Sequence, residues 1–148
     1  MTAIILVLLL STLLLSVFSA DLVIKATDFE AEVIKDERVW IIEFYSPMCG
    51  SCTEFSPTWE KIEKSVKSMV TAKINIDTPE GLRIAQDLKV LDEGIPSVQL
   101  FASSSRETMM AGDILPHKAL MKKIKSSTSH LSRRDDGLLI KQAPAFIS

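Results

Sequence analysis

The sequence predicts an α/β domain in which a central mixed β-sheet is covered by helices on both faces. Apolar runs typical of buried strands alternate along the chain with segments whose apolar residues recur at helical spacing. The last two strand-like runs, residues 97–103 and 107–113, are joined by a short polar turn, so we expect them to be antiparallel. The predicted order is strand, helix, strand, helix, strand, helix, strand, strand, helix, without an internal repeat.

The N-terminal segment, residues 1–20, has no charged side chain and is rich in Leu, Ile and Val. Its apolar core, followed by small residues at Ser19 and Ala20, is typical of a secretory signal peptide. A segment of this length could also cross a bilayer as an uncleaved anchor. Because polar Asp21 follows at once and no basic flank is present, we expect cleavage after Ser19 or Ala20.

The 128 residues that follow this segment are enough for one compact domain, expected at residues 21–126, and too few for two. From residue 127 the composition changes to Ser, Arg, Asp, Gly and Gln, which predicts a mostly disordered tail over residues 127–148. The formal net charge is −2, so the chain lacks the basic surface of a nucleic-acid-binding protein.

The first half of the domain begins with a short strand, "DLVIKA", at residues 21–26. A helix should begin near Thr27, because Glu30 three residues later completes a capping-box pattern. The next run, "RVWIIEFY" at residues 38–45, is almost entirely apolar and predicts a buried strand.

A long amphipathic helix follows this strand, because apolar residues recur at steps of three and four. They are Phe55, Trp59, Ile62, Val66 and Val70. Pro57 lies inside the helix and should kink it.

The second half of the domain continues with a strand at residues 70–76. The segment 78–90 predicts a helix, with Thr78 as its N-cap and Pro79 at its first position. A closing helix is expected at residues 115–127.

The chain has only two cysteines, Cys49 and Cys52, where the buried strand passes into the long helix. Cys49 should therefore occupy the helix N-terminus, where free backbone N–H groups and the helix dipole stabilise a thiolate. Gly50 would allow a tight turn, and Cys52, further into the helix, would be shielded and could resolve a mixed disulfide. As a structural staple the pair would close a very short loop and add little stability.

Zinc is the alternative use of the two cysteines. A structural zinc site needs four ligands, and only His117 and His130 could complete it. His117 lies at the start of a predicted helix and His130 lies in the predicted tail, so both are more consistent with surface histidines. We expect no metal site.

The stretch "WIIEFYSPMCGSC" resembles the active-site sequence of protein disulfide isomerases, whose usual form is "VEFYAPWCGHC". Pro57 matches the family's helix-kinking proline, and "EGIPSVQLF" matches the segment with the family's cis-proline, here Pro96. The similarity extends over residues 21–126. It implies a thioredoxin fold in which Cys49 is the attacking thiol and Cys52 the resolving thiol.

Two charged residues stand alone in otherwise apolar strands, Glu43 and Lys73. An unpaired charge in a covered strand is unfavourable, so we expect these two to pair with each other. The alternative is that both point to solvent at strand ends. The resemblance implies that Glu43 lies buried under the disulfide and removes a proton from Cys52, with help from Lys73.

The resemblance also implies a substrate groove. In the resembled fold Pro96 faces the disulfide, and the backbone of Ile95 pairs with an extended substrate strand. Gly50 and Ser51, between the cysteines, complete this expected substrate-binding set.

The sequence therefore predicts a thiol–disulfide oxidoreductase of the protein disulfide isomerase type, acting on unfolded or disulfide-containing proteins. Ser51 stands where these isomerases usually have His, and Met48 where they have Trp. A neutral hydroxyl stabilises the Cys49 thiolate less than an imidazolium does, which predicts a less oxidising disulfide and leaves a thioredoxin-like reductase as an alternative. A second alternative, of another class, is a client-binding or assembly subunit with little redox activity.

The expected location is the secretory pathway, most simply the endoplasmic reticulum lumen. The chain ends in "AFIS" and not in a Lys-Asp-Glu-Leu-like signal, so secretion or tethering by an uncleaved N-terminus stays open. We expect no metal or organic cofactor beyond the Cys49–Cys52 redox pair. The expected redox partner is glutathione or another thiol–disulfide enzyme.

Overall fold

The computed structural model describes residues 28–103 and 106–142. The expected signal segment, the strand at 21–26 and the Thr27 cap lie outside the described residues, as do the last six positions of the tail. Within the described part, no helix is both long enough and apolar enough to span a membrane.

The sheet is built from four strands in the order β2-β1-β3-β4. The strands are β1 (Trp40–Tyr45), β2 (Val70–Asn75), β3 (Ser97–Phe101) and β4 (Glu107–Ala111). β1 is parallel to β2 and antiparallel to β3, and β3 is antiparallel to β4. The predicted mixed sheet and the antiparallel final pair are therefore confirmed.

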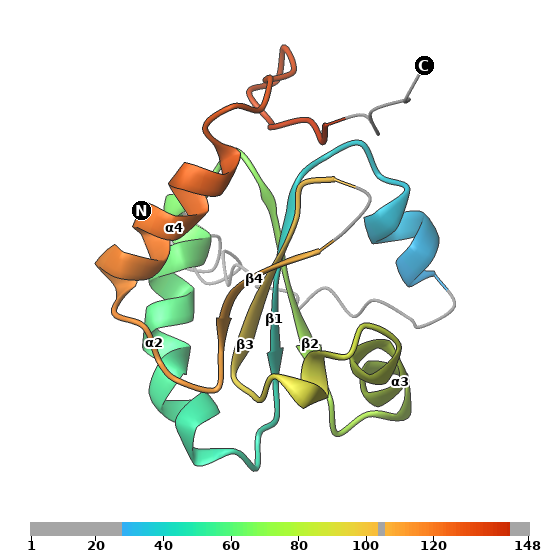
Figure 1. The fold of residues 1–148 in the computed structure, drawn as a ribbon, viewed down its shortest axis with the longest axis vertical. Helices are drawn as coiled ribbons and strands as arrows, with labels where there is room; N and C mark the ends of the chain where they lie inside the picture. The colour runs from blue at the N-terminus through green and yellow to red at the C-terminus, as the bar shows by residue number, and fades with distance from the viewer. Residues whose placement is uncertain (1–27, 104–105, 143–148) are drawn as a thin grey trace, which may run out of the picture.

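Helices cover both faces of the sheet, as predicted (Figure 1). They are η1 (Glu30–Ile34), α2 (Gly50–Ser65), α3 (Pro79–Asp87), η2 (Val90–Asp92) and α4 (His117–Thr128). The Thr78 cap is confirmed, since its hydroxyl accepts a hydrogen bond from the Gly81 N–H at 3.0 Å and Pro79 begins the helix. The helix expected near residue 27 is present only as η1, a five-residue π-helical turn.

The core has two parts, one on each face of the sheet, because successive strand residues point to opposite faces. Ile41 of β1 packs with Phe55 and Trp59 of α2 and with residues of α4. Trp40, Ile42 and Phe44 pack instead with Phe29, α3 and η2. Odd-numbered residues of β1 therefore face α2 and α4, and even-numbered residues face α3 and η2.

The long helix is shorter than predicted. α2 ends at Ser65, Val66 caps it, and Val70 is the first residue of β2. The apolar spacing continued past the true end because Val66 caps the helix while still buried in the core. Val70 then pairs with Trp40 of β1, so its apolar character belongs to the strand.

Residues 129–142 of the tail are ordered against the domain, so the expectation of disorder is wrong for them. Leu139 is 4% exposed in the core, and its N–H donates to the carbonyl of Ser68 at 2.8 Å. Ile140 forms an isolated bridge with Arg38, next to the start of β1. A turn around Gly137 (φ +84°) brings the apolar residues of this polar segment to the domain. Average composition does not detect such a local anchor.

Candidate active site

The predicted site residues gather at the end of the sheet where β1 finishes. β1 runs to Tyr45, and the chain then passes through residues 46–49 into α2. In the antiparallel pairing Phe44 lies opposite Ser97, the first residue of β3. Pro96, which immediately precedes Ser97, therefore lies at the same end of the sheet as the cysteines (Figure 1).

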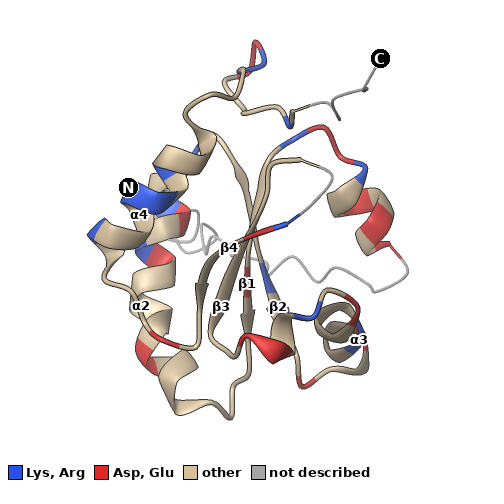
Figure 2. Ribbon diagram, viewed as in Figure 1, with Lys and Arg blue, Asp and Glu red and all other residues tan. Residues whose placement is uncertain are grey.

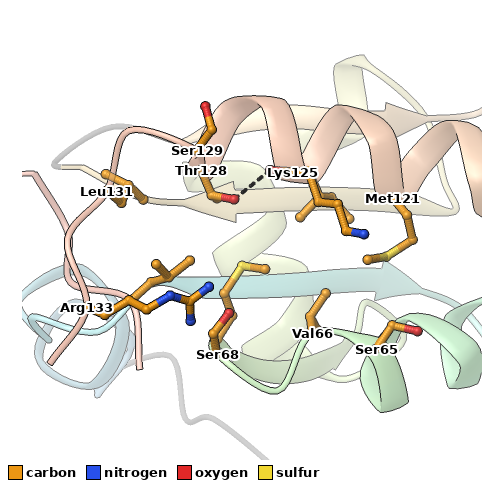
Figure 3. A pocket seen from close by; sticks show the side chains of 12 residues that line it. Ser65, Val66, Ser68, Met121, Lys125, Thr128, Ser129, Leu131 and Arg133 are labelled. Carbon is orange, nitrogen blue, oxygen red and sulfur yellow. Dashed lines mark hydrogen bonds between the residues drawn. The ribbon is translucent and has the colours of Figure 1, made fainter. Parts of the chain in front are cut away.

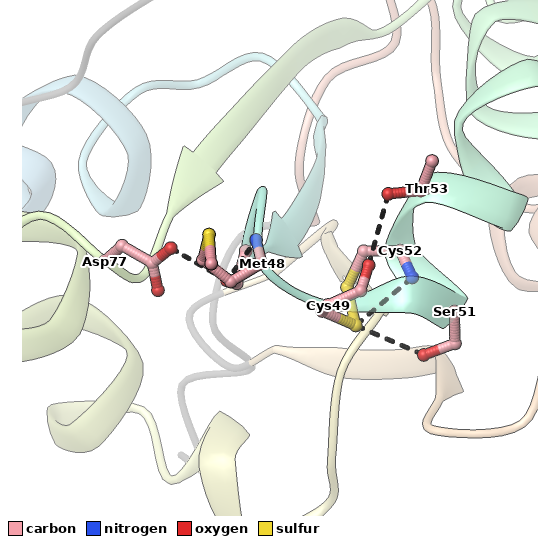
Figure 4. Close-up of a disulfide and its surroundings, with 7 residues drawn as sticks. Met48, Cys49, Ser51, Cys52, Thr53 and Asp77 are labelled. Atoms are coloured by element: carbon pink, nitrogen blue, oxygen red, sulfur yellow. Dashed lines mark hydrogen bonds between the residues drawn. A yellow bond between two sulfur atoms is a disulfide. The ribbon is translucent and has the colours of Figure 1, made fainter.

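The turn between β1 and α2 is fixed by a buried serine that sequence reasoning missed. Ser46 is 6% exposed, and its hydroxyl accepts the Met48 N–H at 3.0 Å and donates to the Asp77 carboxylate at 2.8 Å. Its carbonyl also accepts the Cys49 N–H at 3.1 Å. Figure 4 shows Asp77 directed toward this turn from the segment that follows β2. The only signal in the sequence is that both residues are polar and follow strands.

Cys49 and Cys52 form a disulfide with their Cα atoms 5.2 Å apart. Cys49 is the N-cap of α2, as predicted, and its sulfur accepts the Cys52 backbone N–H at 3.2 Å. The Ser51 hydroxyl lies 3.2 Å from the same sulfur (Figure 4). Cys49 is partly exposed, whereas Cys52 is 3% exposed. The pair is therefore asymmetric, with one cysteine partly exposed to solvent and the other buried.

Glu43 and Lys73 are paired, as expected from the unfavourable burial of lone charges. They lie opposite each other in the β1–β2 register, with the Lys73 ammonium 3.3 Å from a Glu43 carboxylate oxygen. The Glu43 side chain is 1% exposed and that of Lys73 is 19% exposed. Lys73 Nζ also lies 4.3 Å from the centre of the Tyr45 ring. The alternative in which both point to solvent is thereby excluded.

The position of Glu43 in β1 places it on the face covered by α2. It alternates with Ile42 and shares its face with Ile41, which packs against α2 and α4. It also lies opposite Val98, which belongs to the same part of the core. Glu43 is thus on the face whose helix carries both cysteines. Its role in proton transfer stays a prediction.

The Ile95–Pro96 peptide bond is cis, as the family resemblance implied. Pro96 is buried and Ile95 half-buried, and the Pro96 carbonyl accepts the Gly112 N–H at 3.1 Å. Gly94 before them has φ +93°, a conformation that other residues rarely adopt. Substrate binding by Ile95 and Pro96 stays a prediction.

Gly50 and Met48 flank Cys49 and leave it open. Gly50 begins α2 without a positive φ, so the turn that Gly50 would allow is made before it, at residues 47 and 48. A Cβ added to Gly50 would meet no atom within 4 Å, which leaves space beside the disulfide. Met48 is 88% exposed, an unusual exposure for a large apolar side chain. Together with Ser51 these residues border Cys49.

The zinc alternative finds no support in the described residues, where no group of three His, Cys, Asp or Glu is placed to hold a metal ion. His117 begins α4 and borders the same pocket as Ser65, at the opposite end of α2 from the cysteines, and His130 follows α4.

A cavity of about 360 Å³ lies away from the cysteines, at the C-terminal end of α2. Figure 3 shows Met121 and Lys125 of α4 on one side of it, and Leu131 and Arg133 of the tail on another. None of the predicted site residues lines it.

Residues 21–126 match the thioredoxin family model. Among curated relatives, protein disulfide-isomerase A6 of Homo sapiens is 32% identical over 88 residues, covering 58% of this chain and 19% of the relative. The protein disulfide-isomerase A6 homolog of Drosophila melanogaster is 30% identical over 81 residues, covering 54% of this chain and 18% of the relative. The chain thus spans about a fifth of the length of these relatives.

The fold also resembles that of solved structures. The crystal structure of the Trx4 domain of ERdj5 has a TM-score of 0.57 at 22% identity, covering 70% of this chain and 91% of that domain. At this identity the likeness concerns the fold alone.

Proposed function

This chain belongs to the thioredoxin family, and we propose that it is a thiol–disulfide oxidoreductase acting on protein substrates in the secretory pathway. One observation carries the proposal: the disulfide at the N-terminus of α2 joins a partly exposed residue, Cys49, to a buried one, Cys52. Relatives named as protein disulfide-isomerases support the same chemistry.

The reaction exchanges one disulfide for another. In the reduced protein the Cys49 thiolate attacks one sulfur of a substrate disulfide, forms a mixed disulfide and releases the other substrate sulfur as a thiolate. The Cys52 thiolate then attacks the Cys49 sulfur, restores the Cys49–Cys52 bond and releases the second substrate thiolate. Two electrons pass from the dithiol to the substrate, and the reverse sequence oxidises a substrate dithiol.

The helix N-terminus assists the attacking sulfur. The Cys52 N–H and the Ser51 hydroxyl, each 3.2 Å from the Cys49 sulfur, are placed to stabilise negative charge on it. Ser51 is neutral, whereas the His usual in disulfide isomerases can carry a positive charge. We therefore expect the disulfide to be less oxidising than that of an isomerase with Gly-His between its cysteines. A less oxidising disulfide favours the alternative function, a thioredoxin-like reductase.

Glu43 is proposed as the group that takes the proton from Cys52 before Cys52 attacks. It is buried on the face covered by α2, and its ion pair with Lys73 supplies a neighbouring charge that can stabilise the carboxylate. Ile95 and Pro96, with Gly50 and Ser51 across from them, are proposed to line the groove that receives an extended substrate segment. No metal or organic cofactor enters these steps.

The proposed location rests on the sequence of residues 1–20, which is typical of a signal peptide. Protein substrates are supported by the exposure of Met48 and Gly50 on either side of Cys49 and by the names of the relatives. Glutathione or another thiol–disulfide enzyme would return the pair to its starting state. Net charge gives no reason to expect nucleic acid as a partner, and Figure 2 shows acidic and basic segments interspersed.

The proposal is tested by measuring insulin reduction and the reactivation of scrambled ribonuclease with the purified chain. Maleimide labelling before and after reduction should show a reversible Cys49–Cys52 bridge. Faster insulin reduction with weak ribonuclease reactivation would identify the reductase. A Cys49→Ser, Cys52→Ser double variant that keeps full biological activity would instead identify a client-binding subunit.

A further inference from the structure

A polar network lies on the sheet face opposite the cysteines, which no step above uses. Ser97 and Gln99 of β3 are both 0% exposed, and they share a face with Phe101, which packs against the α3 side of the core. Buried polar side chains are unfavourable unless they are hydrogen-bonded, so their partners show what the network holds in place.

Arg106 is the centre of this network. Its Nη1 donates to the Gln99 side-chain carbonyl at 2.7 Å, and its Nε donates to the backbone carbonyl of Leu88, after α3, at 2.8 Å. Its Nη2 forms an ion pair with Glu93. The Arg106 side chain is 19% exposed and that of Glu93 is 33% exposed, so the guanidinium is largely covered while the carboxylate lies at the surface.

Glu93 is held a second time, because the Thr108 hydroxyl donates to its other carboxylate oxygen at 2.6 Å. The hydrogen bond from Arg106 lowers the pKa of Glu93, and the Thr108 bond acts in the same direction against the effect of burial. Glu93 therefore keeps its negative charge, and the connection to Arg106 persists over the neutral pH range.

Gln99 extends the network to Ser97, which follows the loop formed by residues 94–96. Its amide nitrogen donates to the Ser97 hydroxyl at 2.7 Å, and that hydroxyl donates to the Met110 carbonyl at 3.3 Å. Arg106 is thus connected to Glu93, one residue before Gly94, and through Gln99 to Ser97, one residue after Pro96. The segment 94–96 lies between these two attachment points.

We propose that Arg106 is a positioning residue that holds the loop 94–96, and with it the groove for protein substrates, in place from the opposite face of the sheet. This inference rests on the proposed function, because it names the part of the machinery that selects extended protein chains over small disulfides. A loop fixed in the binding conformation loses less freedom when a substrate strand pairs with it, so its affinity is higher.

A purely structural role would give a different result from a positioning role. Loss of stability alone would slow reactions with all disulfides equally, since it reduces the amount of folded protein. Loss of loop positioning would weaken the reaction with a protein disulfide and spare a small disulfide that needs only the Cys49 sulfur.

The test uses the full chain in reduced form and compares Arg106→Met with wild type. Second-order rate constants are measured for insulin and for hydroxyethyl disulfide. We expect the insulin constant to fall about 10-fold and the hydroxyethyl disulfide constant to change less than about 2-fold. Arg83→Met, in the exposed Arg83–Asp87 pair of α3, is the matched control and should change neither constant.

Glu93→Gln provides a second variant if Arg106→Met does not fold. It keeps the side-chain shape and removes the charge, and should lower the insulin constant about 3-fold with the same selectivity. Arg106→Lys should lie between wild type and Arg106→Met, because an ammonium cannot reproduce the planar set of donors. Amide exchange at Gly112, whose N–H bonds the Pro96 carbonyl, should accelerate in Arg106→Met.

Equal changes for the two disulfides, or no change in any of these folded variants, would overturn the positioning role of Arg106. That result is distinct from failure of the proposed function, which would appear as wild-type protein that reduces neither insulin nor hydroxyethyl disulfide.

Discussion

The two faces of the sheet bury polar groups of different kinds. On the face covered by α2 and α4, Glu43 is 1% exposed and lies 3.3 Å from Lys73. On the face covered by α3 and η2, Gln99 is 0% exposed and its amide is hydrogen-bonded to Arg106 and Ser97. The first group is an ionisable carboxylate on the face whose helix carries the cysteines, whereas the second is a neutral amide.

With the roles proposed above, the sheet would separate proton transfer on one face from loop positioning on the other. An ionisable side chain is unfavourable in a core, which is why the proposed function gives Glu43, on the face of α2, the role of proton acceptor. A neutral amide that has its hydrogen bonds satisfied can hold neighbouring segments in place but cannot take part in proton transfer. Variants on the two faces should therefore change different measured quantities.

The largest effect is expected for Cys49→Ser. Because a serine hydroxyl is not ionised near neutrality and forms no disulfide, insulin reduction should fall by at least about 10³-fold. Thermal unfolding should match that of the reduced wild-type protein. Cys52→Ser is the paired variant, and it should still attack but accumulate mixed disulfides that appear on non-reducing gels. Residual turnover of Cys49→Ser would place the chemistry elsewhere.

Glu43→Gln should slow the resolving step about 10²-fold, because loss of a positioned general base has effects of this size. The measurement is the single-turnover rate at which the mixed disulfide disappears, taken across pH. The pH dependence of that rate should flatten in the variant. Glu54→Gln, at an exposed position two residues after Cys52, is the control. An unchanged rate in Glu43→Gln would show that Glu43 is not the proton acceptor for Cys52, and the proposed division of roles between the two faces would fail.

Asp36→Asn should affect stability without affecting chemistry, because Asp36 lies near the start of β1, at the end of the sheet away from the cysteines. Burial acts to raise the pKa of Asp36, but hydrogen bonds from Arg38 and Trp40 outweigh it and lower the pKa from 3.8 to about 2. The stabilising contribution is therefore complete above pH 3.8 and is lost as the pH falls through about 2.

Denaturation of Asp36→Asn should show a free energy of unfolding about 2 kcal/mol lower than wild type at pH 7. The difference should shrink as the pH approaches 2, the pKa of the folded state. Insulin reduction by the folded variant should equal that of wild type. Asp87→Asn, in the exposed pair with Arg83, should show little difference at either pH.

The smallest effect is expected for Ser51→His. An imidazolium beside Cys49 would stabilise the thiolate and make the disulfide more oxidising by about 30 mV, equivalent to about 1.4 kcal/mol. Equilibration with glutathione redox buffers measures this potential. Ser65→His, at the exposed C-terminal end of the same helix, should leave the potential unchanged. A lowered or unchanged potential in Ser51→His would contradict the role assigned to Ser51.

Local patterns in the sequence were sufficient for most elements and for the cysteine pair. The run of apolar residues before Cys49 predicted β1, and Thr78 with Pro79 predicted the start of α3, because caps and buried strands depend on neighbouring residues. The pairing of Glu43 with Lys73 was also predictable, since two opposite charges in covered strands have few other ways to be stabilised.

The tertiary structure alone decided the features whose partners are distant in the chain. The bond between Ser46 and Asp77 spans 31 positions, and the Arg106–Glu93 pair spans 13. Leu139, in a segment whose composition predicts disorder, is buried beside Ser68 and the start of β1. Hydrogen bonds and burial depend on where the folded backbone places two groups. No local pattern records that distance, so the sequence determined the reactive pair while the fold determined what surrounds it and holds it in place.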